Sequence, residues 1–334
     1  MPFIPRFTVT SKILDRIMRI AEAITKIGYG HDSVRLRRIN RLKSLHSSLA
    51  IEGNSLSLDD VTAIMDGREV IGPENEIKEV MNARAAYDMM DSVDPYSLDD
   101  MLSVHKVMMN GLVKNAGRFR NGDEGVFDGE GNCVYLAPRP EYVPDLIDDL
   151  LEWTRESDYP MVLKSCVFHY QFESIHPFED GNGRMGRLWQ TILLMKYDRS
   201  FEWIPVESMI RSYQNEYYDA IAESNKECGC TVFIEFMTRV ILEALNESIE
   251  DRLKEDIEDE MTVNEMMLFS MIKDGHFKNI GQAAEMMKVS VPTLNRCLRS
   301  LKENGIIKKV GNKKTGKWVV IDRGTMIDVT NPIE

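Results

Sequence analysis

The residues from His176 to Arg187 read His-Pro-Phe-Glu-Asp-Gly-Asn-Gly-Arg-Met-Gly-Arg, which combines a titratable base, a carboxylate, a glycine-rich turn and two arginines. The glycines at 181 and 183 let consecutive backbone N–H groups point into one concavity, which suits an anion. We expect a helix to begin near Gly183, where its free N–H groups and positive dipole end add to that attraction. Arg184 and Arg187 are three residues apart, so both face the same side of that helix. The pattern predicts a site for a nucleotide phosphate chain beside a general base.

This run matches the motif of the Fic domain family, His-Pro-Phe-x-Asp/Glu-Gly-Asn-Gly-Arg-x-x-Arg, at every defined position. The surrounding sequence resembles Fic proteins over most of residues 75–240. The resembling segments are Leu102 to His105, Gly117-Arg118-Phe119-Arg120, the trio His169, Phe172 and Ile175, and the trio Tyr217, Tyr218 and Asn225. The resemblance implies a mainly α-helical catalytic domain with a β-hairpin flap. It also implies an enzyme that transfers AMP from ATP to a Tyr, Thr or Ser hydroxyl of a target protein or of itself.

The resemblance gives a role to each motif residue, and the residue types suit these roles. His176 would deprotonate the target hydroxyl, because a neutral imidazole near pH 7 is suited to that task. Asp180 would hold Mg²⁺, an ion that takes one carboxylate together with phosphate oxygens. Backbone N–H groups around Gly181 and Gly183, with Asn182, would hold the α- and β-phosphates. ATP is the implied co-substrate.

The two arginines, one tyrosine and one asparagine complete the predicted nucleotide site. Arg184 would neutralise the charge that develops on the leaving pyrophosphate, and Arg187 would reach the γ-phosphate. Tyr218 and Asn225 resemble the adenine-side residues of Fic proteins, with ordinary helix packing as the alternative for Tyr218. We expect Phe178 to anchor the motif loop in the core and to take no part in the chemistry.

From Gly117 to Arg139 glycine, asparagine and strand-forming residues replace the helical periodicity. This composition predicts a β-hairpin with its tip at 128–132. In Fic proteins a flap of this kind clamps the target by strand pairing. An exposed strand edge offers unpaired main-chain groups for that purpose. The expected edge consists of Cys133, Val134, Tyr135 and Leu136. Strand pairing reads main chain, so the sequence does not identify the target.

The run Ser48-Leu-Ala-Ile-Glu52-Gly53 matches the Fic inhibitory motif, Ser/Thr-x-x-x-Glu-Gly/Asn. Ser48 and Glu52 are four residues apart and share one helical face, and Gly53 suits the position after the helix end. The Glu52 carboxylate would pair with Arg187 in a bidentate contact. That pair would occupy the γ-phosphate site, so ATP would bind in an unproductive pose. Glu52 could instead position a water that removes AMP, and the sequence does not separate the two roles.

The bulk composition limits the class of protein. The chain has 334 residues with 43% hydrophobic residues, enough for a sizeable core, and a formal net charge of −13 excludes a general nucleic-acid coat. Five cysteines show no zinc-binding spacing. There is no apolar run of about 18 residues and no signal-peptide pattern at the N-terminus. We therefore expect a cytoplasmic protein with no membrane partner.

Apolar periodicity predicts that most of the first 255 residues are helical. Expected helices cover 11–27, 34–52, 57–65, 75–91 and 97–110, begin near 144, 161 and 183, and end with a long acidic helix over 231–260. The first has Ser11 as its expected N-cap, Gly28 as its stop, and an isoleucine stripe at 13, 17, 20, 24 and 27. The stripe could pack on its own domain or form a homodimer. The expected domains are an N-terminal helical region 1–70 with the inhibitory motif, a catalytic domain 71–255 and a small α+β domain 256–334.

The C-terminal segment resembles a winged helix-turn-helix. Thr262 with Glu265, Asn279 and Ser290 are expected helix caps, and strands are expected over 306–310 and 317–321. Residues 262–323 hold 12 Lys/Arg against five Asp/Glu, a local charge of +7. The expected DNA contacts are Arg296 and Arg299 on the recognition helix and Lys313 and Lys314 on the wing. Docking of a protein partner is the alternative.

Two other functions fit parts of the same sequence. One is a DNA-binding transcriptional regulator whose Fic site only senses nucleotide, although a sensor would not need His176. The other is a Fic enzyme that transfers a different nucleotide or phosphocholine. Asp180 and the second arginine of the motif favour a nucleoside triphosphate in the usual orientation.

Overall fold

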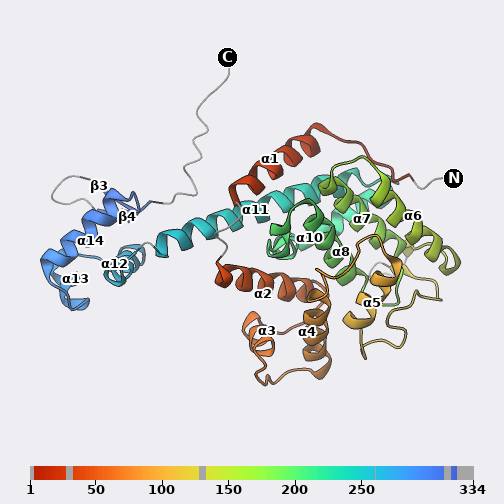
Figure 1. Ribbon diagram of the computed structural model, residues 1–334, viewed down its shortest axis with the longest axis horizontal. Coiled ribbons are helices and arrows are strands. Elements are labelled where there is room, and N and C mark those ends of the chain that lie inside the picture. The colour runs from red at the N-terminus through yellow and green to blue at the C-terminus, as the bar shows by residue number, and fades with distance from the viewer. Residues whose placement is uncertain (1–3, 28–32, 128–132, 260, 312–316, 322–334) are drawn as a thin grey trace, which may run out of the picture. The chain divides into compact units, whose positions relative to one another are not determined.

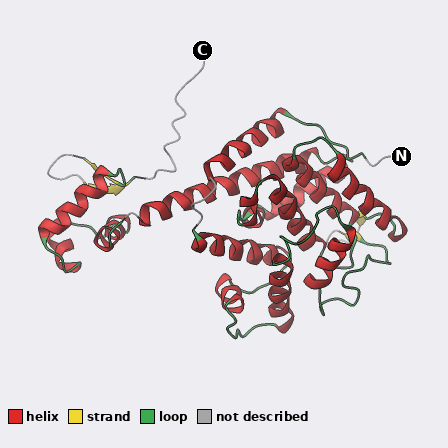
Figure 2. Ribbon diagram, in the orientation of Figure 1, coloured by secondary structure: helices red, strands yellow, loops and turns green. Residues whose placement is uncertain are grey.

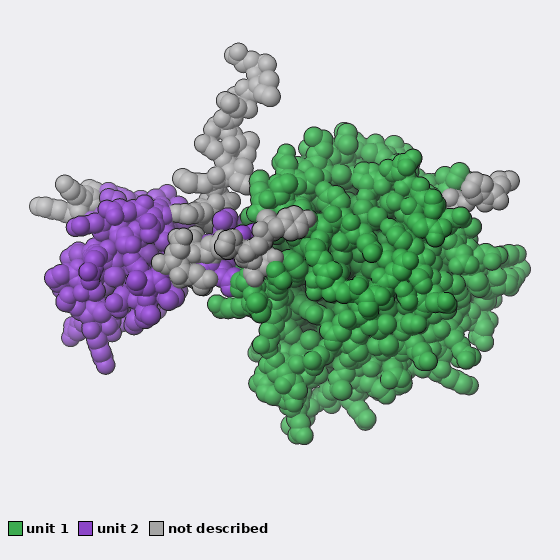
Figure 3. All heavy atoms as spheres, viewed as in Figure 1, with its two compact units in different colours: residues 1–249 green, residues 250–334 purple. Residues whose placement is uncertain are grey.

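A computed structural model describes residues 4–27, 33–127, 133–259, 261–311 and 317–321. The chain divides into two compact units, residues 1–249 and 250–334 (Figure 3). Helices dominate the described residues and only two short hairpins are present among them (Figure 2), which confirms the mainly α class. The hairpin tip at 128–132, Gly28, Lys313 and Lys314 lie outside the described residues. No described helix combines the length and apolar character that a bilayer crossing requires.

The first unit contains the motifs (Figure 1). Its helices are α1 (Ser11–Ile27), α2 (Val34–Ile51), α3 (Leu58–Met65), α4 (Glu74–Tyr87), α5 (Leu98–Met108), α6 (Val143–Glu156), α7 (Met161–Ile175), α8 (Asn182–Tyr197), α9 (Val206–Ser212), α10 (Gln214–Lys226) and α11 (Thr231–Asp259), the last of which continues past the unit boundary. Short 3₁₀ turns cover Pro140–Tyr142 and Arg199–Glu202. The strands β1 (Gly125–Phe127) and β2 (Cys133–Leu136) form an antiparallel hairpin.

Helices α7 and α8 form the centre of this unit. They pack against one another along their length, and both are buried on nearly every side, as expected for helices with apolar residues all round. The loop that joins them carries the motif. Helix α7 ends at Ile175 with His176 as its C-cap, and α8 begins at Asn182 with Gly181 as its N-cap. The motif loop is thus held between two rigid, buried elements.

The N-terminal helices differ from expectation in one detail. Ser11 is the first helical residue of α1, and Thr10 is the cap, because its Oγ1 accepts a hydrogen bond from the backbone N of Ile13 at 3.3 Å. The isoleucine stripe is buried in a core shared with α7, α10 and α11. The stripe therefore packs on its own chain and is not available to a second copy.

Helix α2 carries the inhibitory motif at its C-terminal end. It packs on α3, α4 and α9 and reaches α8. Glu52 is its C-cap and Gly53 follows at φ 92°, a backbone conformation that glycine adopts without strain. A capping box of Ser57 and Asp60 then opens α3. Helix α4 stops at Tyr87, short of the expected 91, because the following residues turn into i→i+3 hydrogen bonds.

The second unit holds the three helices α12 (Val263–Lys273), α13 (Ile280–Met286) and α14 (Val291–Glu303), and the antiparallel strands β3 (Ile307–Val310) and β4 (Lys317–Val320). Thr262 and Glu265 form the expected capping box, and Asn279 and Ser290 cap the next two helices. Leu268, Leu294 and Leu301 lie in the core of this unit. Three helices followed by a two-stranded hairpin is the order of elements that the sequence predicted for this segment.

Candidate active site

The motif loop is fixed by its own side chains. His176 adopts a left-handed conformation with φ 51°, and its backbone N donates to Phe172 O at 2.9 Å. Phe178 is fully buried, as expected. Asn182 closes the loop: its Oδ1 accepts from the N of Phe178 and its Nδ2 donates to the O of Phe178, both at 2.9 Å. The Asn182 side chain therefore shapes the loop, and only its backbone N–H remains for an anion.

Two buried side chains from outside the loop brace it. His105 Nδ1 accepts from Gly117 N at 2.9 Å, so Nε2 carries the proton and donates to Asp180 O at 3.0 Å. Burial lowers the pKa of His105 to about 4, which keeps this arrangement neutral. Arg120 donates from Nε to His176 O at 2.7 Å and from its backbone N to Pro177 O at 2.9 Å. The sequence marked both residues only as part of a family pattern.

The N-terminus of α8 lies where the motif predicts an anion nest. Gly181 has φ 85°, and α8 is 16 residues long, so its first N–H groups carry a developed dipole. A Cβ at Gly183 would overlap with Oε1 of Glu52 and lie 2.9 Å from Nη1 of Arg187. The backbone at Gly183 is thus bare where a phosphate or a carboxylate can approach it, and in this structure a carboxylate does so.

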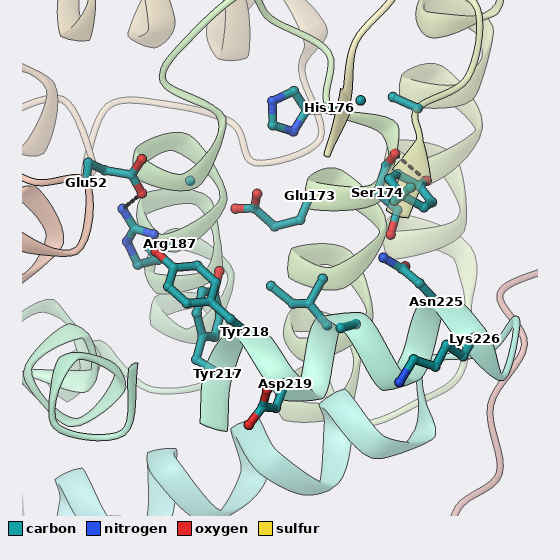
Figure 4. A pocket seen from close by; sticks show the side chains of 16 residues that line it. Glu52, Glu173, Ser174, His176, Arg187, Tyr217, Tyr218, Asp219, Asn225 and Lys226 are labelled. Atoms are coloured by element: carbon teal, nitrogen blue, oxygen red, sulfur yellow. Dashed lines mark hydrogen bonds and ion pairs between the residues drawn. The ribbon is translucent and has the colours of Figure 1, made fainter. Parts of the chain in front are cut away.

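A cavity of about 600 Å³ opens beside the nest (Figure 4). It unites several of the predicted residues from separate elements. Its lining includes Glu52, Tyr135, Glu173, His176, Gly183, Arg187, Tyr218 and Asn225. Burial lowers the pKa of His176 below its ordinary value, so its imidazole is neutral at pH 7. The cavity therefore holds a base, a helix N-terminus and a guanidinium in one compartment.

Arg187 is paired with Glu52, as the inhibitory motif predicts. Arg187 Nη2 lies 2.7 Å from Glu52 Oε1, and the arginine side chain is fully buried while that of Glu52 is 30% exposed. Burial lowers the pKa of Arg187, but the charge and hydrogen bond of Glu52, together with the charges of Tyr217 and Glu173, raise that pKa on balance. The expected bidentate geometry is wrong. Ser48 takes two further contacts, because Nε donates to Ser48 Oγ at 3.1 Å and Nη2 also donates to Ser48 O at 3.0 Å.

Asp180 and Arg184 lie together, outside the described lining of the cavity. Arg184 Nη2 is 3.0 Å from Asp180 Oδ1, and its Nη1 is 3.4 Å from Oε1 of Glu79 on α4. The Asp180 side chain is 54% exposed. The described residues contain no cluster of three metal-ligating side chains. A single accessible carboxylate beside a phosphate nest fits Mg²⁺, which is held mostly by phosphate oxygens and water.

The far end of the cavity is formed by α10. Tyr218 is half-exposed, and its hydroxyl donates to Ile51 O at 3.4 Å. Asn225 lines the same end, where its Oδ1 accepts from Tyr170 OH at 2.7 Å. The structure thus brings both predicted adenine-side residues to the cavity and connects one of them to the end of α2.

The hairpin borders the cavity on a third side. Strand β2 pairs with β1 in a sheet that has two strands within the described residues, so β2 presents a second edge. Tyr135 OH donates to Ser174 O at 2.7 Å, which fastens β2 to the end of α7. Leu136 is 64% exposed. The side chains of Cys133 and Val134 lie outside the described residues.

Two carboxylates near the site were not predicted. Glu173 lies in the last turn of α7, three residues before His176, and its closeness to the motif is the one signal in the sequence that could have marked it. Glu79 reaches Arg184 from a helix about a hundred residues away in sequence, and no local pattern marks it.

The comparisons with known proteins agree with this geometry. The sequence profile of the Fic/DOC family matches residues 95–194. A crystal structure of a Fic family protein from Desulfovibrio desulfuricans G20 is 34% identical, with a TM-score of 0.72, over 96% of this chain and 99% of that one. A probable protein adenylyltransferase of Aquifex aeolicus is 28% identical over 82% of both chains.

Protein adenylyltransferase fic-1 of Caenorhabditis elegans is 30% identical over 58% of this chain, and the match spans only 39% of that longer protein. The Desulfovibrio structure covers nearly the whole chain at an identity that is sufficient for common descent. The protein belongs to the Fic family.

Proposed function

We propose that this protein is an adenylyltransferase that moves AMP from ATP to a hydroxyl of a protein target. One observation carries the proposal: a neutral His176 and the anion nest at Gly183 face the same cavity as Arg187. The relatives from Aquifex aeolicus and Caenorhabditis elegans are named protein adenylyltransferases, which supports the same reaction.

The reaction requires a base, a cradle for phosphates and a stabilised leaving group. The His176 imidazole takes the proton of the target hydroxyl, whose oxygen then forms a bond to the α-phosphorus. The bond between the α-phosphorus and the bridging oxygen breaks, and pyrophosphate leaves with the electron pair. Backbone N–H groups at the start of α8 hold the phosphate oxygens, and Arg184 and Arg187 offset the charge of the leaving group. Mg²⁺ held by Asp180 and phosphate oxygens would supply further positive charge.

Glu52 acts as a brake in this proposal. Its carboxylate lies over Gly183 and against Arg187, where the terminal phosphate of a productive ATP must be placed. A triphosphate that enters with Glu52 in place is displaced from the nest, and its α-phosphorus is turned away from the attacking hydroxyl. The Arg187 side of this charge-assisted pair is buried, which makes Glu52 a stronger competitor than a partner in a surface ion pair.

The target enters along β2. A peptide strand that pairs with the second edge of β2 brings its own hydroxyl toward His176, since Tyr135 fixes that strand to the end of α7. Main-chain pairing makes the contact tolerant of sequence, so selectivity for a target comes from surfaces beyond the strand.

The test uses Glu52→Gly and α-labelled ATP, GTP, UTP and CTP, with mass spectrometry of the products. We expect AMP transfer to rise roughly 10- to 100-fold over the unmodified protein, as a charge-assisted hydrogen bond of 1.5–3 kcal/mol is removed. His176→Ala in the same background abolishes the label. Unchanged labelling in Glu52→Gly contradicts the brake, and labelling that survives His176→Ala contradicts the mechanism. Release of AMP from a labelled target by the unmodified protein, and not by Glu52→Gly, would instead give Glu52 the role of removing AMP.

The second unit supports a second function, binding of double-stranded DNA. Arg296 and Arg299 are exposed on α14, the helix that the winged helix-turn-helix arrangement presents to a major groove. Lys308 and Lys309 on β3 are also exposed, so positive charge continues onto the hairpin. The wing residues Lys313 and Lys314 stay a prediction from the sequence.

An electrophoretic mobility assay with random-sequence duplex tests this second function. The double variant Arg296→Ala/Arg299→Ala should weaken the shift and lower its dependence on salt, because two phosphate contacts are lost. Lys273→Ala, at the end of α12, is the matched control and should leave the shift unchanged. If no shift is seen at low salt, or if the double variant shifts the duplex as well as the unmodified protein does, DNA binding is contradicted. Docking of a protein partner is then the function that remains for this unit.

A further inference from the structure

Glu173 is a carboxyl group in the middle of the cavity that the proposed mechanism does not use. It comes from the last turn of α7, and Figure 4 shows its side chain pointing into the cavity, with Arg187 and Glu52 on one side and Asn225 and Ser174 on the other. The first pair lies at the phosphate end and the second at the base end. Glu173 therefore lies at the level where a nucleotide has its sugar.

The Glu173 carboxyl lacks hydrogen-bond donors. Its side chain is 12% exposed, and Oε1 has no hydrogen-bond partner in the described part of the chain. Gly186 leaves the room for this oxygen, because a Cβ there would lie 2.7 Å from it. Oε1 is enclosed between Gly186 and His169, so a ligand in the cavity would donate to the part of the carboxyl group that remains exposed there.

The neighbouring His169 cannot supply that donor. Gln190 Nε2 donates to Cys166 Sγ at 3.8 Å, so Gln190 Oε1 accepts from His169 Nδ1 at 2.6 Å. This bond leaves His169 Nε2 unprotonated, and Nε2 accepts from Tyr217 OH at 3.1 Å. Burial lowers the pKa of His169 to about 3, so the ring does not gain a second proton near neutral pH. The 3.7 Å approach of Nε2 to Glu173 Oε1 is therefore not an ion pair.

The electrostatic surroundings of Glu173 fit a carboxyl group that accepts hydrogen bonds only when a ligand is bound. Burial raises its pKa to about 7, although Arg187 acts in the opposite direction. Glu52 raises that pKa further. A pair of ligand hydroxyls would offset the burial and favour the ionised carboxylate.

We propose that Glu173 hydrogen-bonds the 2′- and 3′-hydroxyls of the bound nucleotide and makes the site select ribonucleotides over deoxyribonucleotides. The inference rests on the proposed function for the presence of a nucleotide in this cavity. Carboxylates bind ribose hydroxyls in other nucleotide sites because two oxygens match the diol. A phosphate is a poor partner for the same group because the two repel. The base is assigned to the end of the cavity near Asn225.

The consequence is discrimination of sugars. A site built to pair with a hydroxyl rejects an analogue that lacks it, because the buried acceptor is then left without a donor. Since the sugar contact is the same in the ground state and the transition state, its loss should raise KM far more than it lowers kcat. Removal of the Glu173 side chain should therefore weaken the binding of ATP and leave the affinity for 2′-deoxyATP almost unchanged.

The experiment uses the Glu52→Gly protein and the two additional changes Glu173→Gln and Glu173→Ala. Affinities for ATP, 2′-deoxyATP and 3′-deoxyATP are measured by calorimetry, and KM and kcat for AMP transfer are measured separately. We expect the Glu52→Gly protein to prefer ATP over 2′-deoxyATP by at least about tenfold. Glu173→Ala should reduce this preference to about twofold or less, and the isosteric Glu173→Gln should lie between the two. The 3′-deoxy analogue reports on the other hydroxyl.

Glu207→Gln is the matched control, because Glu207 is another fully buried carboxyl of the same unit, on α9, and it does not line the cavity. It should leave the sugar preference intact even where it alters stability. If the Glu173 variants weaken the binding of ATP and of both deoxy analogues by the same factor, the inference is overturned. Sugar-selective binding that depends on Glu173, without any transfer, overturns the proposed function alone. A folded protein that binds none of the three nucleotides overturns both.

Discussion

Nη1 of Arg184 lies 3.4 Å from Oε1 of Glu79, and Oε2 of Glu79 accepts a hydrogen bond from Nδ2 of Asn54 at 2.8 Å. Asn54 follows Glu52 by two residues. Both arginines of the motif are therefore paired with carboxylates, and the two carboxylates are joined through the short segment after α2. We therefore predict that the brake proposed for Glu52 extends to Arg184.

Glu79→Ala should release this second contact. We expect AMP transfer to rise about two- to fivefold, less than for Glu52→Gly, because the Glu79 side chain is partly exposed and such a pair contributes about 1 kcal/mol or less. Initial rates of labelling measure the effect. Glu74→Ala in the first turn of α4 is the control and should not change the rate. A rate that falls in Glu79→Ala would show that Glu79 positions Arg184 for catalysis instead.

The pH dependence of transfer should reflect a histidine that titrates below its ordinary pKa of 6.5. Burial lowers the pKa of His176, while Glu124 and Glu52 raise it and Arg120 lowers it. The base is active when neutral, so kcat/KM should be at its plateau at pH 7 and fall only as pH drops below 6.5. In Glu52→Gly the raising charge of Glu52 is gone, which moves the acid limb further down. A profile between pH 5 and 8 with its midpoint above 6.5 would contradict this assignment.

Gly183→Ala should abolish nucleotide binding without loss of the fold. The added methyl group would overlap with the position of Glu52 Oε1 and crowd Nη1 of Arg187, so it fills the nest itself. Alanine is a better helix former than glycine by about 1 kcal/mol, and the position is in the first turn of α8. Calorimetry should therefore detect no ATP binding even in the Glu52→Gly background, while circular dichroism shows an unchanged helix content. ATP binding that persists would place the phosphates elsewhere.

Glu173→Gln should stabilise the protein at alkaline pH. The folded-state pKa of about 7 lies above the usual 4.5, so the cost of burying the carboxyl is absent below pH 4.5, grows between pH 4.5 and about 7, and stays constant above that. The glutamine variant removes that penalty, which is at most about 3 kcal/mol above pH 7. Urea unfolding at pH 5 and pH 8.5 measures the difference between variant and parent. An equal difference at both values would show that Glu173 is not buried in its ionised form.

The linear sequence was sufficient for features that depend on near neighbours. The capping box at Thr262, the helix start at Ser57 and the turn at Gly53 each use residues within four positions, and all three lie where they were expected, although the part of Asp60 in capping at Ser57 was not predicted. The motif predicted the nest because its glycines and arginines share one helix. Thr10 replaced Ser11 as a cap because two adjacent hydroxyls compete for the same helix end.

Contacts between segments that are distant in the sequence could not be predicted from it. The single-oxygen contact between Arg187 and Glu52 follows from where Ser48 presents its hydroxyl and its carbonyl, which is set by the packing of α2 on α8. Glu79 has no motif because its partner belongs to another helix. The direction of the Asn182 amide depends on the backbone of Phe178, which only the folded loop defines.

The left-handed backbone at His176 affects how its chemistry should be probed. Histidine and asparagine enter that region with little strain, whereas alanine and above all β-branched residues resist it. A dead alanine variant thus confounds a missing proton acceptor with a displaced peptide. Asparagine keeps the peptide in place and removes only the proton acceptor. His176→Asn is therefore the better variant for capturing an uncleaved ATP complex with an undisturbed loop.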